Sequence, residues 1–188
     1  MKVLLLNGSP KAAGCTFRAL TEVKKALLEE QIEAEIIQAV DPSMEAVKAL
    51  AQKLKEADGL IVGSPVYYAS PSGEVLAVMD KLAGIAKKDM AFKPAAAIAS
   101  ARRAGTTATI DVLLKYLTIN QMMIVSSDYW PMVHGNTPVE VEEDQEGLHV
   151  MRTLGHNMAW LLKSIEAGKK AGISLPQNEP KINTNFIR

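Results

Sequence analysis

The sequence predicts an α/β fold: a doubly wound, five-stranded parallel sheet with helices on both faces, forming a three-layer sandwich. Short apolar runs of strand length alternate along the chain with segments in which apolar residues recur every three or four positions. Most of these runs are continuously apolar, which is typical of parallel strands that are buried on both faces. Because crossover connections between parallel strands are right-handed, repeated strand–helix units wind into such a sheet.

The first half of the chain predicts three strands and two helices. Lys2–Asn7 is a continuous apolar run, whereas Glu33–Gln38 is mixed and indicates an edge strand. Gly59–Gly63 is the third strand. A helix comes after the first strand, with its apolar positions at Leu20, Val23, Leu27 and Leu28. A second helix has Ser43 as its predicted N-cap, with apolar positions at Val47, Leu50, Leu54 and Ala57.

The rest of the chain, from Ser70 onward, predicts two more strands and three helices. Ser70-Pro71 supplies a predicted N-cap and a proline for the first helical position of a helix to about Leu82. Ala95–Ala99 and Met122–Val125 are the fourth and fifth buried strands, with a helix over Thr107–Tyr116 between them. The last helix carries one apolar stripe: Met151, Leu154, Met158, Leu161, Leu162 and Ile165.

Composition predicts one globular domain. A chain of 188 residues suits a single domain, here residues 1–172, with a polar tail at 173–188. The net charge is 0, so we expect neither nucleic acid nor membrane as a partner. A single cysteine suits a reducing, cytoplasmic setting. Ser126–Gly147 is a connection long enough to indicate a functional role.

Ligands of such sheets bind beyond the carboxyl ends of the strands. Asn7–Phe17 comes after the first strand and leads into a helix, whose N-terminal amides favour a phosphate. Ser9 and Thr16 add hydroxyl donors, and Lys11 adds a positive charge. The glycine spacing matches neither a Walker A loop nor a G-x-G-x-x-G loop. An ordinary turn rich in turn-forming residues is the alternative.

Two further loops lie at the same edge. Ser64–Gly73 contains the adjacent Tyr67 and Tyr68, which can stack on a planar ligand or remain surface aromatics. Ser100–Thr107 contains Arg102 and Arg103 just before a helix, where cations oppose the helix dipole. These arginines indicate a ligand with negative character, with solvated loop arginines as the alternative.

Together the three loops resemble the flavodoxin-like NAD(P)H-dependent FMN reductase family, over about residues 1–165. The matching segments are NGSPKAAGCT, ADGLIVGSPVYYASPSGEVLAVMDKL and SARRAGTTATIDVLLKYLTINQM. Within the family, the chain is most similar to the branch of the iron–sulfur flavoproteins and their relatives without a cluster. That branch carries a cysteine cluster after the second strand, but Ile37–Ser43 contains no cysteine. We therefore expect no iron–sulfur cluster and no metal site.

The resemblance implies which residues bind FMN. The ribityl phosphate would be held by Ser9, Lys11, Gly14, Cys15, Thr16 and Phe17. The isoalloxazine would be lined by Pro65, Val66, Tyr67 and Tyr68, and its other edge closed by Ser100, Ala101, Arg102, Arg103, Ala104 and Gly105. The family often has asparagine at position 15. We interpret Cys15 as a small loop residue whose thiol leans toward thiolate at the helix start until a phosphate binds.

The function implied is an FMN-dependent NAD(P)H oxidoreductase with ping-pong hydride transfer to a small-molecule acceptor such as a quinone or free flavin. No catalytic side chain is needed, although Arg102, Arg103 and His134 can tune the flavin; a solvated loop residue is the alternative for His134.

Family members are dimers or tetramers, so we expect a homodimer or homotetramer. The rival is a flavodoxin-type electron carrier, but such carriers are typically strongly acidic and this chain is neutral. A receiver domain would need an aspartate where the first and third strands end in Asn7 and Ser64.

Overall fold

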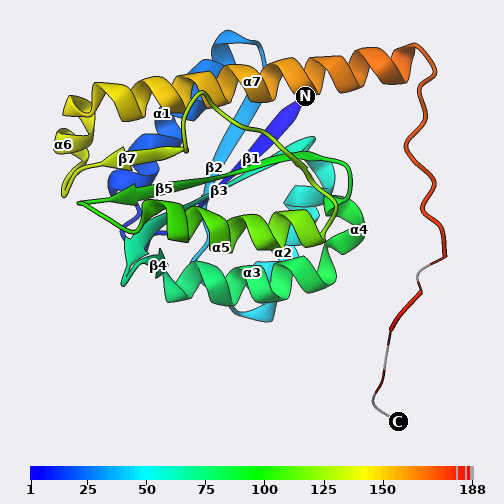
Figure 1. The fold of residues 1–188 in the computed structure, drawn as a ribbon, viewed down its shortest axis with the longest axis horizontal. Helices are drawn as coiled ribbons and strands as arrows, with labels where there is room; N and C mark the ends of the chain where they lie inside the picture. Colours follow the sequence, from blue (N-terminus) through cyan, green and yellow to red (C-terminus); the bar gives the residue numbers. More distant parts are fainter. Residues whose placement is uncertain (181, 185, 187–188) are drawn as a thin grey trace.

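Five parallel core strands cross the molecule in the order β2-β1-β3-β5-β6 (Figure 1). Their bounds are β1 Lys2–Asn7, β2 Glu33–Gln38, β3 Gly59–Tyr67, β5 Pro94–Ala101 and β6 Met123–Ile124. This computed structural model describes residues 1–180, 182–184 and 186. The chain starts in the middle of the sheet, moves out to β2 and then crosses to β3. The predicted doubly wound five-stranded parallel sheet is therefore confirmed.

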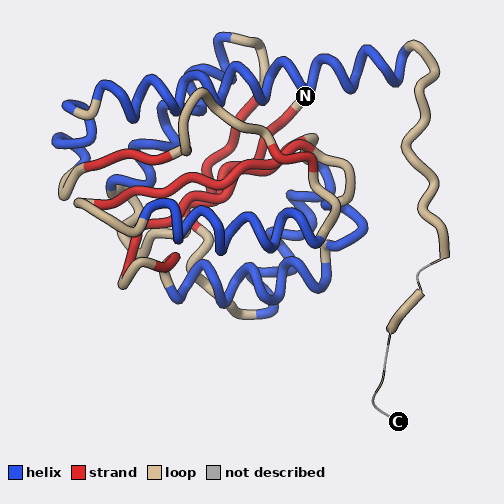
Figure 2. Tube along the Cα trace, viewed as in Figure 1, coloured by secondary structure: helices blue, strands red, loops and turns tan. Residues whose placement is uncertain are grey.

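Helices cover both faces of the sheet (Figure 2). One face carries α2 (Met44–Glu56), α3 (Gly73–Ile85), α4 (Lys87–Met90) and α5 (Thr106–Ile119), and the other carries α1 (Cys15–Glu29), α6 (Pro138–Glu143) and α7 (Gln145–Lys170). Within β1, Leu4 and Leu6 join the core under α2, α3 and α5, whereas Val3 and Leu5 face α1 and α7. This alternation results from the two-residue period of a strand and builds the predicted three layers.

The register brings three loops to one edge of the sheet. Asn7 pairs with Gly63 across β1 and β3, and Pro65 pairs with Ser100 across β3 and β5. The Gly8 amide then donates to the Gly63 carbonyl at 2.8 Å. The crevice beyond these strand ends lies between β1 and β3, where the strand order reverses.

The predicted helix start at Ser70-Pro71 is wrong. These residues form the short strand β4 (Ser70–Pro71), antiparallel to the end of β3. Tyr68 and Ala69 both adopt positive φ, so they close a two-residue hairpin before the helix can begin. Ser72 is the N-cap of α3 instead, and its hydroxyl accepts from the Val75 amide at 3.2 Å. The predicted Ser43 cap of α2 is confirmed, with the Ala46 amide as donor.

The fifth strand is shorter than predicted. A strand forms within the predicted Met122–Val125, but β6 has only two residues, Met123 and Ile124, which are 42% and 40% exposed; Met122 and Val125 on either side are buried, so only the prediction of a fully buried strand is wrong. The chain leaves the edge of the sheet and returns as β7 (Met132–His134), which pairs in parallel with the end of β5. The 126–147 connection thus contains a strand as well as α6. β5 is held on this side by two short strands in succession.

The described part of the tail, residues 173–180, 182–184 and 186, contains no helix or strand (Figure 1, red end). The division into a domain over 1–172 and a tail over 173–188 stays a prediction. None of the helices formed by the described residues combines the length and the apolar character that crossing a membrane requires.

Candidate cofactor-binding site

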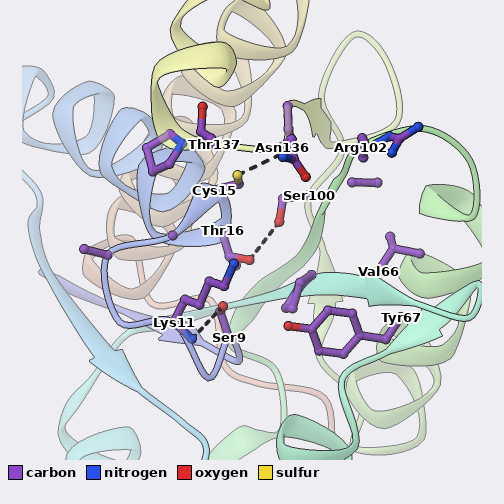
Figure 3. A pocket seen from close by; sticks show the side chains of 16 residues that line it. Ser9, Lys11, Cys15, Thr16, Val66, Tyr67, Ser100, Arg102, Asn136 and Thr137 are labelled. Carbon is purple, nitrogen blue, oxygen red and sulfur yellow. Dashed lines mark hydrogen bonds between the residues drawn. The ribbon is translucent and has the colours of Figure 1, made fainter.

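A cavity of about 480 Å³ lies at the carboxyl edge of the sheet (Figure 3). Its lining comes from four segments: Ser9, Lys11, Ala13, Gly14, Cys15, Thr16, Pro65, Val66, Tyr67, Ser100, Ala101, Arg102, Gly135, Asn136, Thr137 and Pro138. The first three segments are the loops expected from the sequence. The fourth, Gly135–Pro138 after β7, lies in the 126–147 connection for which a functional role was predicted, directly after His134, but these four residues were not predicted as lining. The volume is typical of a site for a small molecule or cofactor.

Asn7 at the end of β1 orders the first loop. Its Oδ1 accepts from the Ser9 amide and its Nδ2 donates to the Ala12 carbonyl, each at 3.1 Å. The Ser9 hydroxyl in turn accepts from the Lys11 amide at 3.1 Å. Gly14 closes this loop against Lys11, since a Cβ at position 14 would lie 3.1 Å from the Lys11 Cβ. The loop is thus fixed by its own side chains before it enters α1.

Two of the helices that start at this edge, α1 and α5, have no side-chain cap. α1 begins after Gly14 and α5 after Gly105; neither helix has a capping hydrogen bond or an acidic residue in its first turn. The other long helices, α2, α3 and α7, each have both. First-turn amides that receive no cap are free donors, and the helix dipole adds a partial positive charge. In α1 these amides belong to the residues that line the cavity, so the cavity can bind an anion.

Buried hydroxyls connect the loops. The Thr16 and Ser100 hydroxyls lie 2.8 Å apart and tie the first loop to the end of β5, as Figure 3 shows. Ser72 donates to the Gly8 carbonyl at 2.6 Å, which fixes the start of α3 to the first loop. The Ser64 hydroxyl accepts from the Ser72 amide at 2.9 Å. These hydrogen bonds hold the three loops together at the carboxyl edge of the sheet.

The two adjacent tyrosines lie in different places. Tyr67 ends β3 and lines the cavity, whereas Tyr68 is fully exposed at the tip of the hairpin. Tyr68 and Ala69 have φ of 50° and 56°, a conformation that costs a residue with a side chain roughly 1–2 kcal/mol. The third loop packs closely on this hairpin, since a Cβ at Gly105, whose φ is +96°, would lie 2.8 Å from the Ala69 Cα.

The fourth wall, Gly135–Pro138, is held by a pair of hydrogen bonds that resembles a capping box. The Thr137 hydroxyl accepts from the Glu140 amide at 3.3 Å, and the Glu140 carboxylate accepts from the Asn136 amide at 2.7 Å. The Cys15 thiol donates to the Gly135 carbonyl at 3.5 Å and joins this wall to α1. The sequence did contain the signal, because Thr-x-x-Glu with proline after the threonine is a helix-start pattern.

An ion-pair network fastens this wall from behind. Arg18 of α1 forms a two-pronged pair with Glu142 of α6, with Nη2 2.7 Å from Oε2. The Arg18 Nη1 lies 2.9 Å from the buried Glu22, which Arg152 of α7 also contacts at 2.7 Å. Burial acts to raise the pKa of Glu22, but the hydrogen bonds from Arg152 and Arg18 outweigh it and the pKa is lowered. Glu22 therefore stays ionised and links α1 to α7, and Arg18 extends the network to α6 through Glu142.

The pKa of the Cys15 thiol is shifted in the opposite direction to the one expected from the sequence. Burial raises the pKa of its thiol, and this outweighs the nearby Lys11 charge. The prediction that the thiol leans toward thiolate at the helix start is therefore wrong for the protein without ligand. Its role in the structure is that of a small side chain that donates to Gly135.

Several predicted residues lie outside the cavity lining. Phe17 is 37% exposed and faces a groove between α1 and β2. Tyr68 lines a second hollow instead. Of the third loop's predicted residues, Arg103, Ala104 and Gly105 are absent from the lining of the cavity, whereas Arg102 belongs to it. His134 has an exposed side chain, and its backbone amide donates to Asp144 at 2.6 Å. Among the described residues, no group of three or more histidine, cysteine or acidic side chains is placed to hold a metal.

Comparisons with known proteins show the family of this chain. The model of a family described as NADPH-dependent FMN reductase matches residues 1–137. An iron–sulfur flavoprotein of Methanocaldococcus jannaschii is 30% identical over 196 residues, covering 88% of this chain and 100% of that protein. Another, from Archaeoglobus fulgidus, is 27% identical over 131 residues, covering 62% of this chain and 66% of that protein.

Solved structures show the same fold. A WrbA-like flavodoxin from Agrobacterium tumefaciens has a TM-score of 0.67 at 18% identity and covers 87% of this chain and 98% of its own. The Trp repressor binding protein of Bacillus subtilis has a TM-score of 0.64 at 18% identity, covering 81% of this chain and 96% of its own. The expected flavodoxin-like fold is therefore confirmed.

Proposed function

The chain belongs to the NADPH-dependent FMN reductase family, a family of FMN-binding oxidoreductases, and we propose that it oxidises NAD(P)H and reduces a small organic acceptor such as a quinone or free flavin. When bound, FMN supplies the redox chemistry, taking a hydride from the nicotinamide and passing two electrons to the acceptor in a separate half-reaction. The observation that carries the proposal is the uncapped start of α1, which opens onto the cavity.

The residues around the first loop fit the phosphate end of FMN. The first-turn amides of α1 provide donors, and the Ser9 and Thr16 hydroxyls and the Lys11 ammonium stand beside them. Such a set matches a phosphate, which offers three acceptor oxygens and carries about −1.5 to −2 charges. The absence of a side chain at Gly14 leaves room for a phosphate to approach the backbone of the first loop. A larger residue there would crowd Lys11.

The opposite end of the cavity fits a flat, largely apolar ring. Pro65, Val66 and Tyr67 form one side of it at the end of β3. In Figure 3, Val66 and Tyr67 lie across from Lys11 and Thr16. Arg102 stands at the edge, where a cation stabilises negative charge that develops on the ring during reduction. Asn136 and Thr137 complete the wall. The chain's residues thus bind and orient the cofactor, and no side chain has to act as a general base.

The relatives are named iron–sulfur flavoproteins, but this chain has one cysteine. Because a cluster of that kind is held by several cysteine thiolates, we propose that this protein works with FMN alone. We further propose that it acts as a homodimer or homotetramer.

The proposal is tested by titrating the protein with FMN and then measuring NADPH oxidation at several fixed acceptor concentrations. We expect FMN binding, and parallel double-reciprocal lines because the two substrates bind in turn. Gly14→Val, which crowds the phosphate end, should abolish FMN binding, while Gly73→Ala, placed in open space on α3, should not. A protein that binds FMN but leaves NADPH and NADH unoxidised would be an electron carrier instead.

A further inference from the structure

Gln38, the last residue of β2, holds the first loop of the cavity from the neighbouring strand. In the sheet it pairs with Asn7, from which this loop starts. Its Nε2 donates to the Ser9 carbonyl at 3.0 Å and to the Pro10 carbonyl at 3.3 Å. Gln38 is not one of the residues that line the cavity, so any effect it has on a ligand there is transmitted through the loop.

The peptide between Ser9 and Pro10 depends on this contact more than an ordinary peptide does. Because proline has no backbone N–H, the Ser9 carbonyl is the one group through which this peptide can form a conventional hydrogen bond. Within the part of the chain that the structure describes, that carbonyl has Gln38 as its single hydrogen-bond partner. In the next peptide, Gln38 binds the Pro10 carbonyl while the Ser9 hydroxyl accepts from the Lys11 amide at 3.1 Å. Gln38 therefore fixes the orientation of two successive peptide planes.

The orientation of these two peptides matters for an anion in the cavity. A phosphate is attracted by the first-turn amides of α1, but it would be repelled by a loop carbonyl turned toward it, because the oxygen is the negative end of the peptide dipole. With both carbonyls bound to β2, neither can turn into the cavity without breaking its hydrogen bond with Gln38. The same peptides set the direction of Lys11, whose side chain stands beside Ser9 in the cavity lining (Figure 3).

We propose that Gln38 is a positioning residue for the phosphate end of the cavity: it holds the Ser9 and Pro10 carbonyls away from the ligand and so keeps the first loop in the form that binds an anion. The inference rests on the proposed function and adds to it a residue outside the cavity lining. Because the hydrogen bonds of the Gln38 side chain go to the first loop alone, its effect is confined to the phosphate end and leaves the ring end unchanged.

The test compares FMN with riboflavin, which has the same ring and no phosphate, in fluorescence titrations of the whole chain. Gln38→Met keeps the length of the side chain and removes its donor. We expect its Kd for FMN to rise about fivefold, as for the loss of an ordinary hydrogen bond, and its Kd for riboflavin to equal that of the wild type. Gln52→Met is the matched control, because Gln52 is an exposed glutamine on α2 whose amide contacts Glu56 instead of the loop. It should bind both flavins as the wild type does.

The absorption spectrum of bound FMN is the second readout, because it reports the surroundings of the ring. At saturating FMN it should be the same in Gln38→Met and the wild type, and it decides the matter if riboflavin binds too weakly to titrate. An unchanged FMN affinity in Gln38→Met overturns the inference. An equal loss of FMN and riboflavin affinity, or a shifted spectrum, also overturns it, since either result means that the substitution loosens the whole cavity. A wild type that binds no FMN refutes the proposed function itself.

Discussion

Glu142→Gln tests how the fourth wall of the cavity is held. Glu142 lies on α6, directly after Gly135–Pro138, and its carboxylate receives both the Nε and Nη2 of Arg18. Glutamine keeps the size of the side chain and removes its charge. Arg18 is largely buried, with a side chain 12% exposed, whereas Glu142 is 55% exposed. The substitution therefore weakens a pair that is half in solvent, while Arg18 keeps its second partner, Glu22.

The expected magnitude is set by that exposure. Pairs at the surface contribute up to about 1 kcal/mol, so we expect a loss of about that size in the docking of α6. If FMN binds only when the wall is docked, its apparent affinity falls by at most the same free energy, which is up to about fivefold in Kd. Because exposed pairs are screened, raising the salt concentration should reduce the difference between variant and wild type.

The assay is a fluorescence titration of FMN at low and high salt, run alongside Glu143→Gln. Glu143 is the neighbouring exposed carboxylate and serves as the control for charge alone. We expect the Glu143 variant to bind FMN like the wild type. An unchanged FMN affinity in Glu142→Gln at low salt would refute the idea that α6 must be docked for the cavity to be complete.

Three further predictions concern single residues. Glu22→Gln should destabilise the protein by about 1.5–3 kcal/mol at neutral pH, because the largely buried Arg18 and the partly exposed Arg152 lose their charged hydrogen bonds to this carboxylate. Since the folded-state pKa of Glu22 is lowered, its contribution is present above the unfolded pKa and disappears as pH falls through the folded pKa; denaturant unfolding should show the two proteins converging in acid. Arg102→Ala should lower the reduction potential of bound FMN in a dye-equilibration titration, whereas Arg103→Ala, outside the lining, should not. A thiol reagent should modify Cys15 faster in the FMN-free protein than in the FMN-bound one; equal rates would remove Cys15 from the phosphate end.

Periodicity in the sequence predicted most of the fold, and the predictions failed where a local backbone conformation decides the outcome. Buried runs such as Lys2–Asn7 mark the strands, and their parallel arrangement brings the three loops to one edge of the sheet. Ser70-Pro71 has the composition of a helix start, yet the positive φ of Tyr68 and Ala69 turns the chain back into a strand first. None of these four residues is a glycine or asparagine that would have indicated the turn.

The cavity itself could be predicted only in part. Three of its walls come from loops that directly succeed predicted strands, whereas Gly135–Pro138 comes after β7, a three-residue strand too short to show a pattern. Its position depends on long-range contacts, chiefly those of Arg18 with Glu142 and of Cys15 with Gly135, which no local rule describes. The capping box at Thr137 was the one local signal available there.

The most direct test of FMN-dependent NAD(P)H oxidation by this protein is an anaerobic absorption spectrum. The protein is incubated with FMN, desalted, and scanned before and after addition of NADPH, with NADH in a parallel sample. We expect flavin absorption to be retained on desalting, to be bleached by at least one of the two nucleotides, and to return when an acceptor is added. A protein that emerges from the desalting column without flavin absorption would contradict the assignment of the cavity to FMN.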